Sequence, residues 1–153
     1  VNIQGDEPLI DPALVDAIAD CLRDPDGGWD MVTAAAPYDG DPDDPDKVKV
    51  VCARDGAALY FSRSRIPHRR DASSAAAPVW RHVGLYGYRT EFLLRLTAEP
   101  PCDLERSERL EQLRALYIGG RIRVLPCEDR VMGADRPEDV AVIEALLREG
   151  GTA

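Results

Sequence analysis

Hydrophobic and polar positions along this chain follow two different periods. Short apolar or alternating runs predict β-strands at positions 1–3, 31–36, 47–52, 57–61, 82–88 and 121–125. Apolar residues spaced three and four apart predict helices at positions 12–22, 92–96, 104–117 and 140–147. Because helical segments separate the apolar strands and no internal repeat is visible, the pattern predicts an α/β fold with a mainly parallel sheet.

Turn and cap residues sharpen this outline. Asp11 followed by Pro12 is typical of a helix start, with an N-cap and a proline at the first helical position. Asp55-Gly56 joins two predicted strands and indicates an inserted hairpin. Positions 39–46 are rich in Asp, Pro and Gly, so we expect a loop whose charges are solvated.

Composition narrows the class of protein. The 153 residues suit one domain, and 28 acidic against 19 basic residues argue against a general nucleic-acid binder. No apolar run approaches the ~20 residues that span a bilayer, and no signal peptide is visible. The four widely spaced cysteines and two histidines favour reduced cytosolic thiols over a zinc site. The chain begins within a strand pattern and without Met, from which we expect a fragment of a longer protein.

Two acidic residues are candidate metal ligands. Asp6 follows the first predicted strand after Gly5, at the strand end where ligands bind in open α/β sheets. Asp135 lies in the turn before the last predicted helix. If both turns lie over one sheet edge, the two carboxylates could hold Mg²⁺. The alternative for Asp6 is an ordinary Asx-type turn.

Three other features could bind a ligand or be purely structural. Positions 62–70 contain four Arg and one His, which could clamp an acidic group or form a solvated basic loop. His82 and Tyr86 share one strand face with the small Gly84 between them, which could leave room for a bound molecule. Glu111 falls opposite the apolar stripe of its predicted helix, where solvation alone explains it.

Five ordered segments resemble the 3-deoxy-manno-octulosonate cytidylyltransferases, the CMP-Kdo synthetases of bacterial lipopolysaccharide assembly. The matching segments are positions 2–10, positions 48–51 followed by 58–63 and 66–67, and positions 81–89, 110–114 and 133–139. The resemblance covers nearly the whole chain. It implies a three-layer, Rossmann-like nucleotide-diphospho-sugar transferase fold, with positions 1–153 forming one partial cytidylyltransferase domain.

The resemblance also implies an activity and a set of site residues. In that family CTP and the acidic sugar 3-deoxy-D-manno-octulosonate (Kdo) give CMP-Kdo and pyrophosphate. Asp6 and Asp135 would hold catalytic Mg²⁺, and Arg63 and Arg70 would bind the sugar carboxylate. The sugar pocket would be lined by Gln4, Arg63, Arg70, His82, Tyr86, Glu111 and Gln112. A cytoplasmic homodimer is expected.

Two departures from the family pattern qualify these expectations. The family's opening phosphate loop, I-P-A-R-x-x-S-x-R-x-P-x-K, has no counterpart here, so we expect an N-terminally truncated domain of low activity by itself. Arg136 stands where the family usually has Thr before Pro137. Loss of that helix cap costs about 0.5–2 kcal/mol and could draw Asp135 away from a metal.

Two alternative functions remain open at this stage. One is a sister cytidylyltransferase that acts on another acidic sugar, such as a sialic acid. The other is a non-catalytic remnant that binds a sugar or a partner protein, which the missing phosphate loop supports. The segments at positions 81–89 and 110–114 favour the Kdo enzyme.

Overall fold

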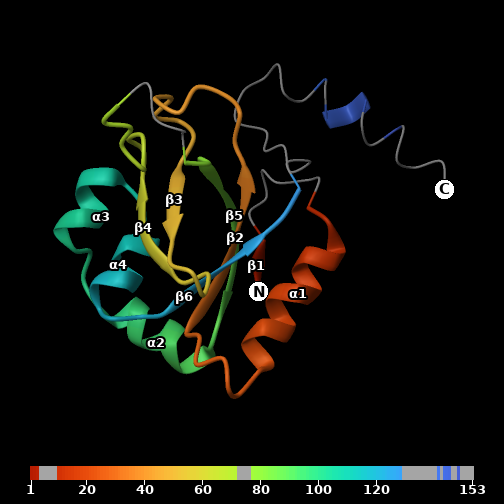
Figure 1. Cartoon of the computed structure of the whole chain (residues 1–153). Helices are drawn as coiled ribbons and strands as arrows, with labels where there is room; N and C mark the ends of the chain where they lie inside the picture. Colours follow the sequence, from red (N-terminus) through yellow and green to blue (C-terminus); the bar gives the residue numbers. More distant parts are fainter. Residues whose placement is uncertain (4–9, 72–76, 129–140, 142, 146–147, 149–153) are drawn as a thin grey trace.

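A six-stranded sheet lies between one helix on one face and three helices on the other in the computed structural model (Figure 1). The structure describes residues 1–3, 10–71, 77–128, 141, 143–145 and 148. The strands are β1 (Asn2–Ile3), β2 (Met31–Pro37), β3 (Lys49–Cys52), β4 (Ala58–Ser62), β5 (Trp80–Tyr88) and β6 (Ile122–Pro126). The helices are α1 (Pro12–Arg23), α2 (Thr90–Ala98), α3 (Asp103–Glu108) and α4 (Gln112–Tyr117). The predicted α/β class and its three layers are confirmed.

The predicted mainly parallel sheet is wrong for the described strands. The order is β4-β3-β5-β2-β6, and β1 also pairs with β5. Four of the five described pairings are antiparallel, and only β2 with β6 is parallel. Helix α1 does connect two strands that run in the same direction, β1 and β2. However, β5 lies between them and runs antiparallel to both, a long-range insertion that the helix-strand alternation does not reveal.

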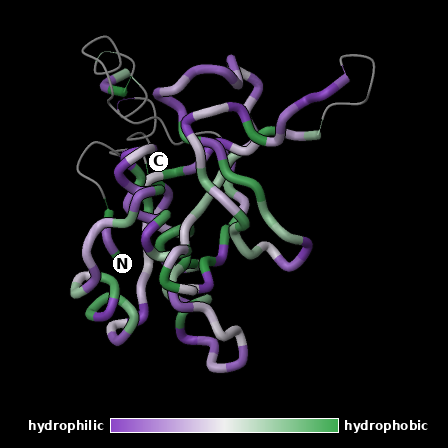
Figure 2. Tube along the Cα trace, turned by 90° about the vertical axis from the view of Figure 1, so that its left-hand side faces the viewer, coloured by the Kyte–Doolittle hydropathy of each residue, from purple (hydrophilic) through white to green (hydrophobic). Residues whose placement is uncertain are grey.

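Local signals placed helix α1 and the hairpin correctly. The Asp11 carboxylate accepts a hydrogen bond from the Ala13 amide at 2.8 Å, and Pro12 begins the helix as predicted. In the hairpin of β3 and β4, Gly56 has φ +78°, a conformation that favours glycine. In Figure 2 hydrophilic positions concentrate in such peripheral loops, whereas the strands carry many hydrophobic ones.

The predicted helix at positions 104–117 is divided into α3 and α4. Arg109 has φ 54° and ψ 49°, the left-handed conformation that ends a helix, so α3 stops at Glu108. Helix α4 then starts at Gln112. Leu110, which lies between the two helices, and Leu113 of α4 are still buried in the apolar core. The apolar spacing continues across the break, which is why periodicity alone predicted one helix.

The C-terminal part of the chain is described at a few positions. Residues 141, 143–145 and 148 are helical, which agrees with the predicted terminal helix, and Ile143 is buried. Among the described residues there is no helix with the length and apolar character needed to cross a membrane.

Candidate functional site

Several predicted site residues lie on the sheet face covered by α2, α3 and α4. Lys49 of β3 pairs with Ser62 of β4 and with Arg81 of β5. The next residues, Arg63 and His82, therefore lie at the same level of the sheet, two strand spacings or about 10 Å apart. Two segments that are separate in sequence are thus brought to one end of this face.

His82 is held in its neutral form mainly by burial, and its ring bonds to Thr33. Its Nε2 lies 2.9 Å from the Thr33 hydroxyl, which donates to the main-chain oxygens of Leu85 (2.8 Å) and Val83 (3.3 Å). In the tautomer that lets this hydroxyl donate to the carbonyls, Nε2 carries the ring proton and Nδ1 can accept. Burial, with a smaller effect of Arg81, lowers the pKa of His82 to about 3. His82 can therefore orient a ligand but does not supply a positive charge near neutral pH.

The Thr33 hydroxyl also bonds to the main chain at a bulge in β5. Thr33 pairs with Tyr86 and Ala34 pairs with Val83, so Gly84 and Leu85 are extra residues relative to β2. The Thr33 hydroxyl bonds to carbonyls on both sides of Gly84. Since two residues are added, the alternation of faces is preserved, and His82 and Tyr86 stay on one face as predicted.

An aromatic row follows this face of the sheet. The ring centroids of Phe61 and His82 are 5.1 Å apart, those of His82 and Tyr86 5.4 Å, and those of Tyr86 and Tyr88 6.1 Å. Burial, then Tyr88 and Glu111, raises the pKa of Tyr86. Burial, then Glu111, raises the pKa of Tyr88 to about 12. Both phenols keep their protons and remain available as donors.

The break between α3 and α4 presents two polar residues. Glu111 is exposed, as predicted, but it precedes α4 instead of facing away from the stripe of a longer helix. Gln112 is only 4% exposed, and its Nε2 has no hydrogen-bond partner in the described part of the chain. A buried donor without an acceptor costs about 1–3 kcal/mol, so a ligand oxygen at this amide would be stabilising.

Arg63 is tied to helix α3 through Glu108. The Glu108 carboxylate accepts from the Arg63 amide at 2.9 Å and from the Ser62 hydroxyl at 2.7 Å. The main-chain oxygen of Glu108 accepts from Arg63 Nε at 2.8 Å, and the Pro45 oxygen accepts from Nη1 at 3.0 Å. Helix α3 thus fixes both the main chain and the side chain of Arg63.

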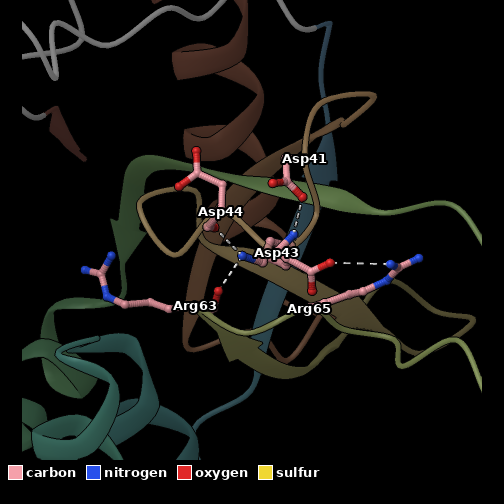
Figure 3. A network of polar contacts seen from close by, with 6 residues as sticks. Asp41, Asp43, Asp44, Arg63 and Arg65 are labelled. Atoms are coloured by element: carbon pink, nitrogen blue, oxygen red, sulfur yellow. Dashed lines mark hydrogen bonds and ion pairs between the residues drawn. The ribbon is translucent and has the colours of Figure 1, made fainter.

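Lys49 connects Arg63 to the acidic loop at positions 39–46. Its side chain is fully buried, and Nζ donates to the main-chain oxygens of Arg63 (2.5 Å) and Asp44 (2.7 Å), which converge in Figure 3. Burial lowers the pKa of Lys49, and the carboxylate of Asp44 opposes this shift. Asp43 forms an ion pair with Arg65 at 3.6 Å. The prediction that the loop's charges are only solvated is wrong for Asp43, which pairs with Arg65, and for Asp44, whose charge acts on Lys49.

The remaining predicted site residues are Arg70, Gln4, Asp6 and Asp135. Arg70 is exposed. Gln4, Asp6 and Asp135 lie outside the described residues, so the predicted metal pair stays a prediction. Among the residues that the structure describes, no group of three or more His, Cys, Asp or Glu side chains could hold a metal ion.

Sequence reasoning missed Thr33, Lys49 and Glu108. Thr33 and Lys49 stand in strands whose other residues are largely apolar, and buried polar side chains in such strands need partners. The two polar residues were visible in the sequence, but they were interpreted only as parts of predicted strands. Glu108 had no local signal, because its partner Ser62 lies 46 residues away in sequence.

Comparisons with known proteins show the family and the fold of this chain. A family model described as "Cytidylyltransferase" matches residues 1–123. The chain is 48% identical over 149 residues to a 3-deoxy-manno-octulosonate cytidylyltransferase of Solibacter usitatus, covering 97% of this chain and 59% of that protein. It is 47% identical over 152 residues to the protein of the same name from Nitratidesulfovibrio vulgaris, covering 97% and 60%.

A solved structure shows the same fold. It is a CMP:2-keto-3-deoxy-manno-octonic acid synthetase complexed with CTP, with a TM-score of 0.89 and 35% identity over 97% of this chain and 61% of that chain. The resemblance predicted from the sequence segments is confirmed. The present chain spans about 60% of the length of the curated relatives it matches.

Proposed function

The chain belongs to the cytidylyltransferase family, and on that premise we propose that it serves in CMP transfer from CTP to Kdo. The products are CMP-Kdo and pyrophosphate, and the reaction supports lipopolysaccharide synthesis. The observation that carries the proposal is the buried Gln112 amide, whose Nε2 has no partner in the described part of the chain. It stands on α4, which packs on the sheet face that bears His82 and Tyr86. Relatives that share 47–48% of its residues carry the name of this activity.

The side chains on this face suit a sugar that bears a carboxylate. Arg63 supplies a fixed positive fork of donors, which matches a carboxylate in geometry and charge. Tyr86, neutral His82 and the Gln112 amide supply hydrogen bonds for hydroxyl groups. These residues orient the sugar so that its anomeric hydroxyl can approach the α-phosphorus of CTP. Orientation of two reactants in one site is a large part of rate enhancement.

Mg²⁺ belongs to the proposal through Asp6 and Asp135, and both residues lie outside the described part of the chain. The assignment rests on the family resemblance and on the preference of Mg²⁺ for carboxylate oxygens. When bound, the ion would offset the repulsion between the acidic sugar and the triphosphate and stabilise charge on the departing pyrophosphate. Arg136 beside Asp135 is the departure from the family pattern that bears on this assignment.

Pyrophosphate release by the full gene product that carries this chain tests the proposal. We expect release to require CTP, Kdo and Mg²⁺ together, and a sialic acid in place of Kdo to be a poor substrate. Asp6→Asn and Asp135→Asn should each lower the rate by orders of magnitude, as expected for the loss of charge stabilisation. Asp103→Asn, an exposed acid on α3, is the matched control.

The outcomes separate the alternatives. Preference for sialic acid over Kdo would favour the assignment as a sister cytidylyltransferase that acts on sialic acid. Kdo binding without any pyrophosphate release would favour a non-catalytic sugar-binding protein. Unchanged rates in both Asp variants would remove the metal assignment.

A homodimer and a cytoplasmic location complete the proposal. None of the four cysteines, all within the described part of the chain, forms a disulfide, which suits a reducing compartment. Several large apolar side chains are exposed on the helical face, among them Leu94 (66%) and Tyr117 (68%), which suits burial against a second subunit. Sedimentation analysis of the full gene product measures the oligomeric state directly.

A further inference from the structure

We propose that Glu108 is a positioning residue for Arg63 and that Lys49 fixes the opposite side of the same residue. Glu108 holds the Arg63 amide and Nε, and Lys49 holds the Arg63 carbonyl oxygen. The inference rests on the proposed function, in which Arg63 binds the carboxylate of the sugar. It assigns to Glu108 and Lys49 a role in substrate specificity without contact with the substrate.

The main chain of Arg63 needs such support because the sheet ends just before it. Strand β4 stops at Ser62, whose partner Lys49 is the first residue of β3. Beyond this pair, β3 and β4 no longer form the regular hydrogen bonds that would hold the main chain of Arg63. The Glu108 carboxylate accepts the Arg63 amide at 2.9 Å, and Lys49 Nζ donates to the Arg63 carbonyl at 2.5 Å. Charged partners therefore replace the ladder on both sides of one residue.

The guanidinium of Arg63 is oriented by neutral acceptors. The Glu108 main-chain oxygen takes Nε–H, and the Pro45 main-chain oxygen takes one proton of Nη1. Of the five donor protons of an arginine, the second proton of Nη1 and both protons of Nη2 have no acceptor in the described part of the chain. These three protons lie at the end of the guanidinium, where a carboxylate can bind with two hydrogen bonds.

The direction of the Glu108 carboxylate explains why it does not occupy the end of the Arg63 guanidinium, where a ligand would bind. That carboxylate accepts hydrogen bonds from the Ser62 hydroxyl and the Arg63 amide. In the described part of the chain it makes no ion pair with the Arg63 guanidinium. A carboxylate paired with the guanidinium would compete with the substrate for the same donors. In Figure 3 the side chains of Arg63 and Arg65 point in opposite directions, and only Arg65 is paired with an acid, Asp43. Of these two arginines, Arg63 is therefore the better placed to bind an acidic ligand.

Steady-state kinetics of the full gene product test the inference. In Glu108→Gln one oxygen acceptor and the negative charge are lost, so Arg63 is held less firmly. We expect the KM for Kdo to rise about tenfold, the usual scale for one charge-assisted hydrogen bond, while the KM for CTP changes less than about twofold. Asp103→Asn removes the same charge from the same helix at an exposed side chain paired only with Arg106, and it should change neither constant.

A double-mutant cycle separates positioning from general damage to the fold. In an Arg63→Ala background, Glu108→Gln should alter the KM for Kdo by less than about twofold, because its effect passes through Arg63. Ser62→Ala removes one partner of the Glu108 carboxylate and should raise the KM for Kdo in the same direction by a smaller factor. If Glu108→Gln unfolds the protein, Ser62→Ala carries the test.

A measurement without substrate distinguishes failure of this inference from failure of the proposed function. The ¹⁵N-coupled Arg63 Nε–H signal, identified by its loss in Arg63→Lys, should exchange slowly with water in the native protein. It should exchange at least about tenfold faster in Glu108→Gln, because the main chain of Arg63, which carries this donor, is held less firmly. Slow exchange in Glu108→Gln, or equal rises in the KM values for Kdo and CTP, would overturn the inference. Faster exchange in a protein that does not convert Kdo would uphold the positioning of Arg63 and overturn the sugar assignment alone.

Discussion

The two faces of the central sheet bury different kinds of side chain. The face under α1 is apolar, with Ile18 and Leu85 both 0% exposed. The face under α2, α3 and α4 encloses Thr33, His82 and Gln112 among its apolar residues. Both faces belong to the same strands, and the polarity differs because successive residues of a strand point to opposite sides.

The difference separates a closely packed surface from the surface at which we propose that the sugar binds. Close packing dominates the α1 face, where a Cβ on Gly87 would lie 2.5 Å from Ile18 Cγ2. On the other face, burial of polar groups is tolerated because Thr33 and His82 satisfy one another, whereas the Gln112 amide remains open. A buried amide without a hydrogen-bond partner, such as that of Gln112, is a candidate contact for a bound ligand.

The largest expected effect concerns the apolar face. Ile18→Ala should lower the free energy of unfolding by about 2–5 kcal/mol, since a fully buried side chain leaves a cavity. The KM for Kdo of the folded fraction should stay the same. Chemical denaturation measures the first quantity, and the exposed Leu59→Ala is the control. A change in the KM for Kdo would show that the two faces are coupled.

Thr33→Val should affect both stability and binding. Valine keeps the shape but removes the hydroxyl that serves His82 and the carbonyls of Val83 and Leu85. We expect a loss of about 1–3 kcal/mol in the free energy of unfolding and a several-fold higher KM for Kdo. Thr33→Ser retains the hydroxyl and should preserve the KM. Equal KM values for Thr33→Val and Thr33→Ser would remove Thr33 from the site.

His82 should make unfolding depend on pH. Its pKa is lowered to about 3 in the fold, against about 6.5 when unfolded, so the unfolded state alone takes up the proton between these values. Stability is therefore fully present above pH ~6.5 and falls as the pH drops toward 3, by about 2 kcal/mol at pH 5. Denaturation curves at pH 7.5 and pH 5 should show a smaller difference in His82→Gln. The exposed His68→Gln should keep the native difference.

The smallest effect is expected at Glu111. Its side chain is exposed, so Glu111→Gln should change the free energy of unfolding by less than about 0.5 kcal/mol. The pKa of Tyr88, about 12 in the native protein, should fall because one of its two causes is the charge of Glu111. Ultraviolet titration of the phenols reports this shift. A constant pKa would place Glu111 too far from the aromatic row to act on a ligand there.

Much of the local structure could be predicted because its causes are local. Asp11 with Pro12 predicted the start of α1, and Asp55-Gly56 predicted the hairpin, since caps and turns depend on neighbouring residues. The shared face of His82 and Tyr86 followed from the period of a strand and survived a bulge that adds two residues. The family segments predicted the site residues, of which Arg63, His82, Tyr86, Glu111 and Gln112 lie on or beside one sheet face.

The sequence by itself therefore determined the caps, the turns, the alternation of faces and the family to which the chain belongs. Only the tertiary structure decided that β5 lies antiparallel between β1 and β2, and that Glu108 meets Ser62 across 46 residues. It also decided that Thr33 and Lys49 are buried with partners in distant segments. The physical reason is that caps and periods depend on neighbours along the chain, whereas these contacts depend on which distant segments pack together.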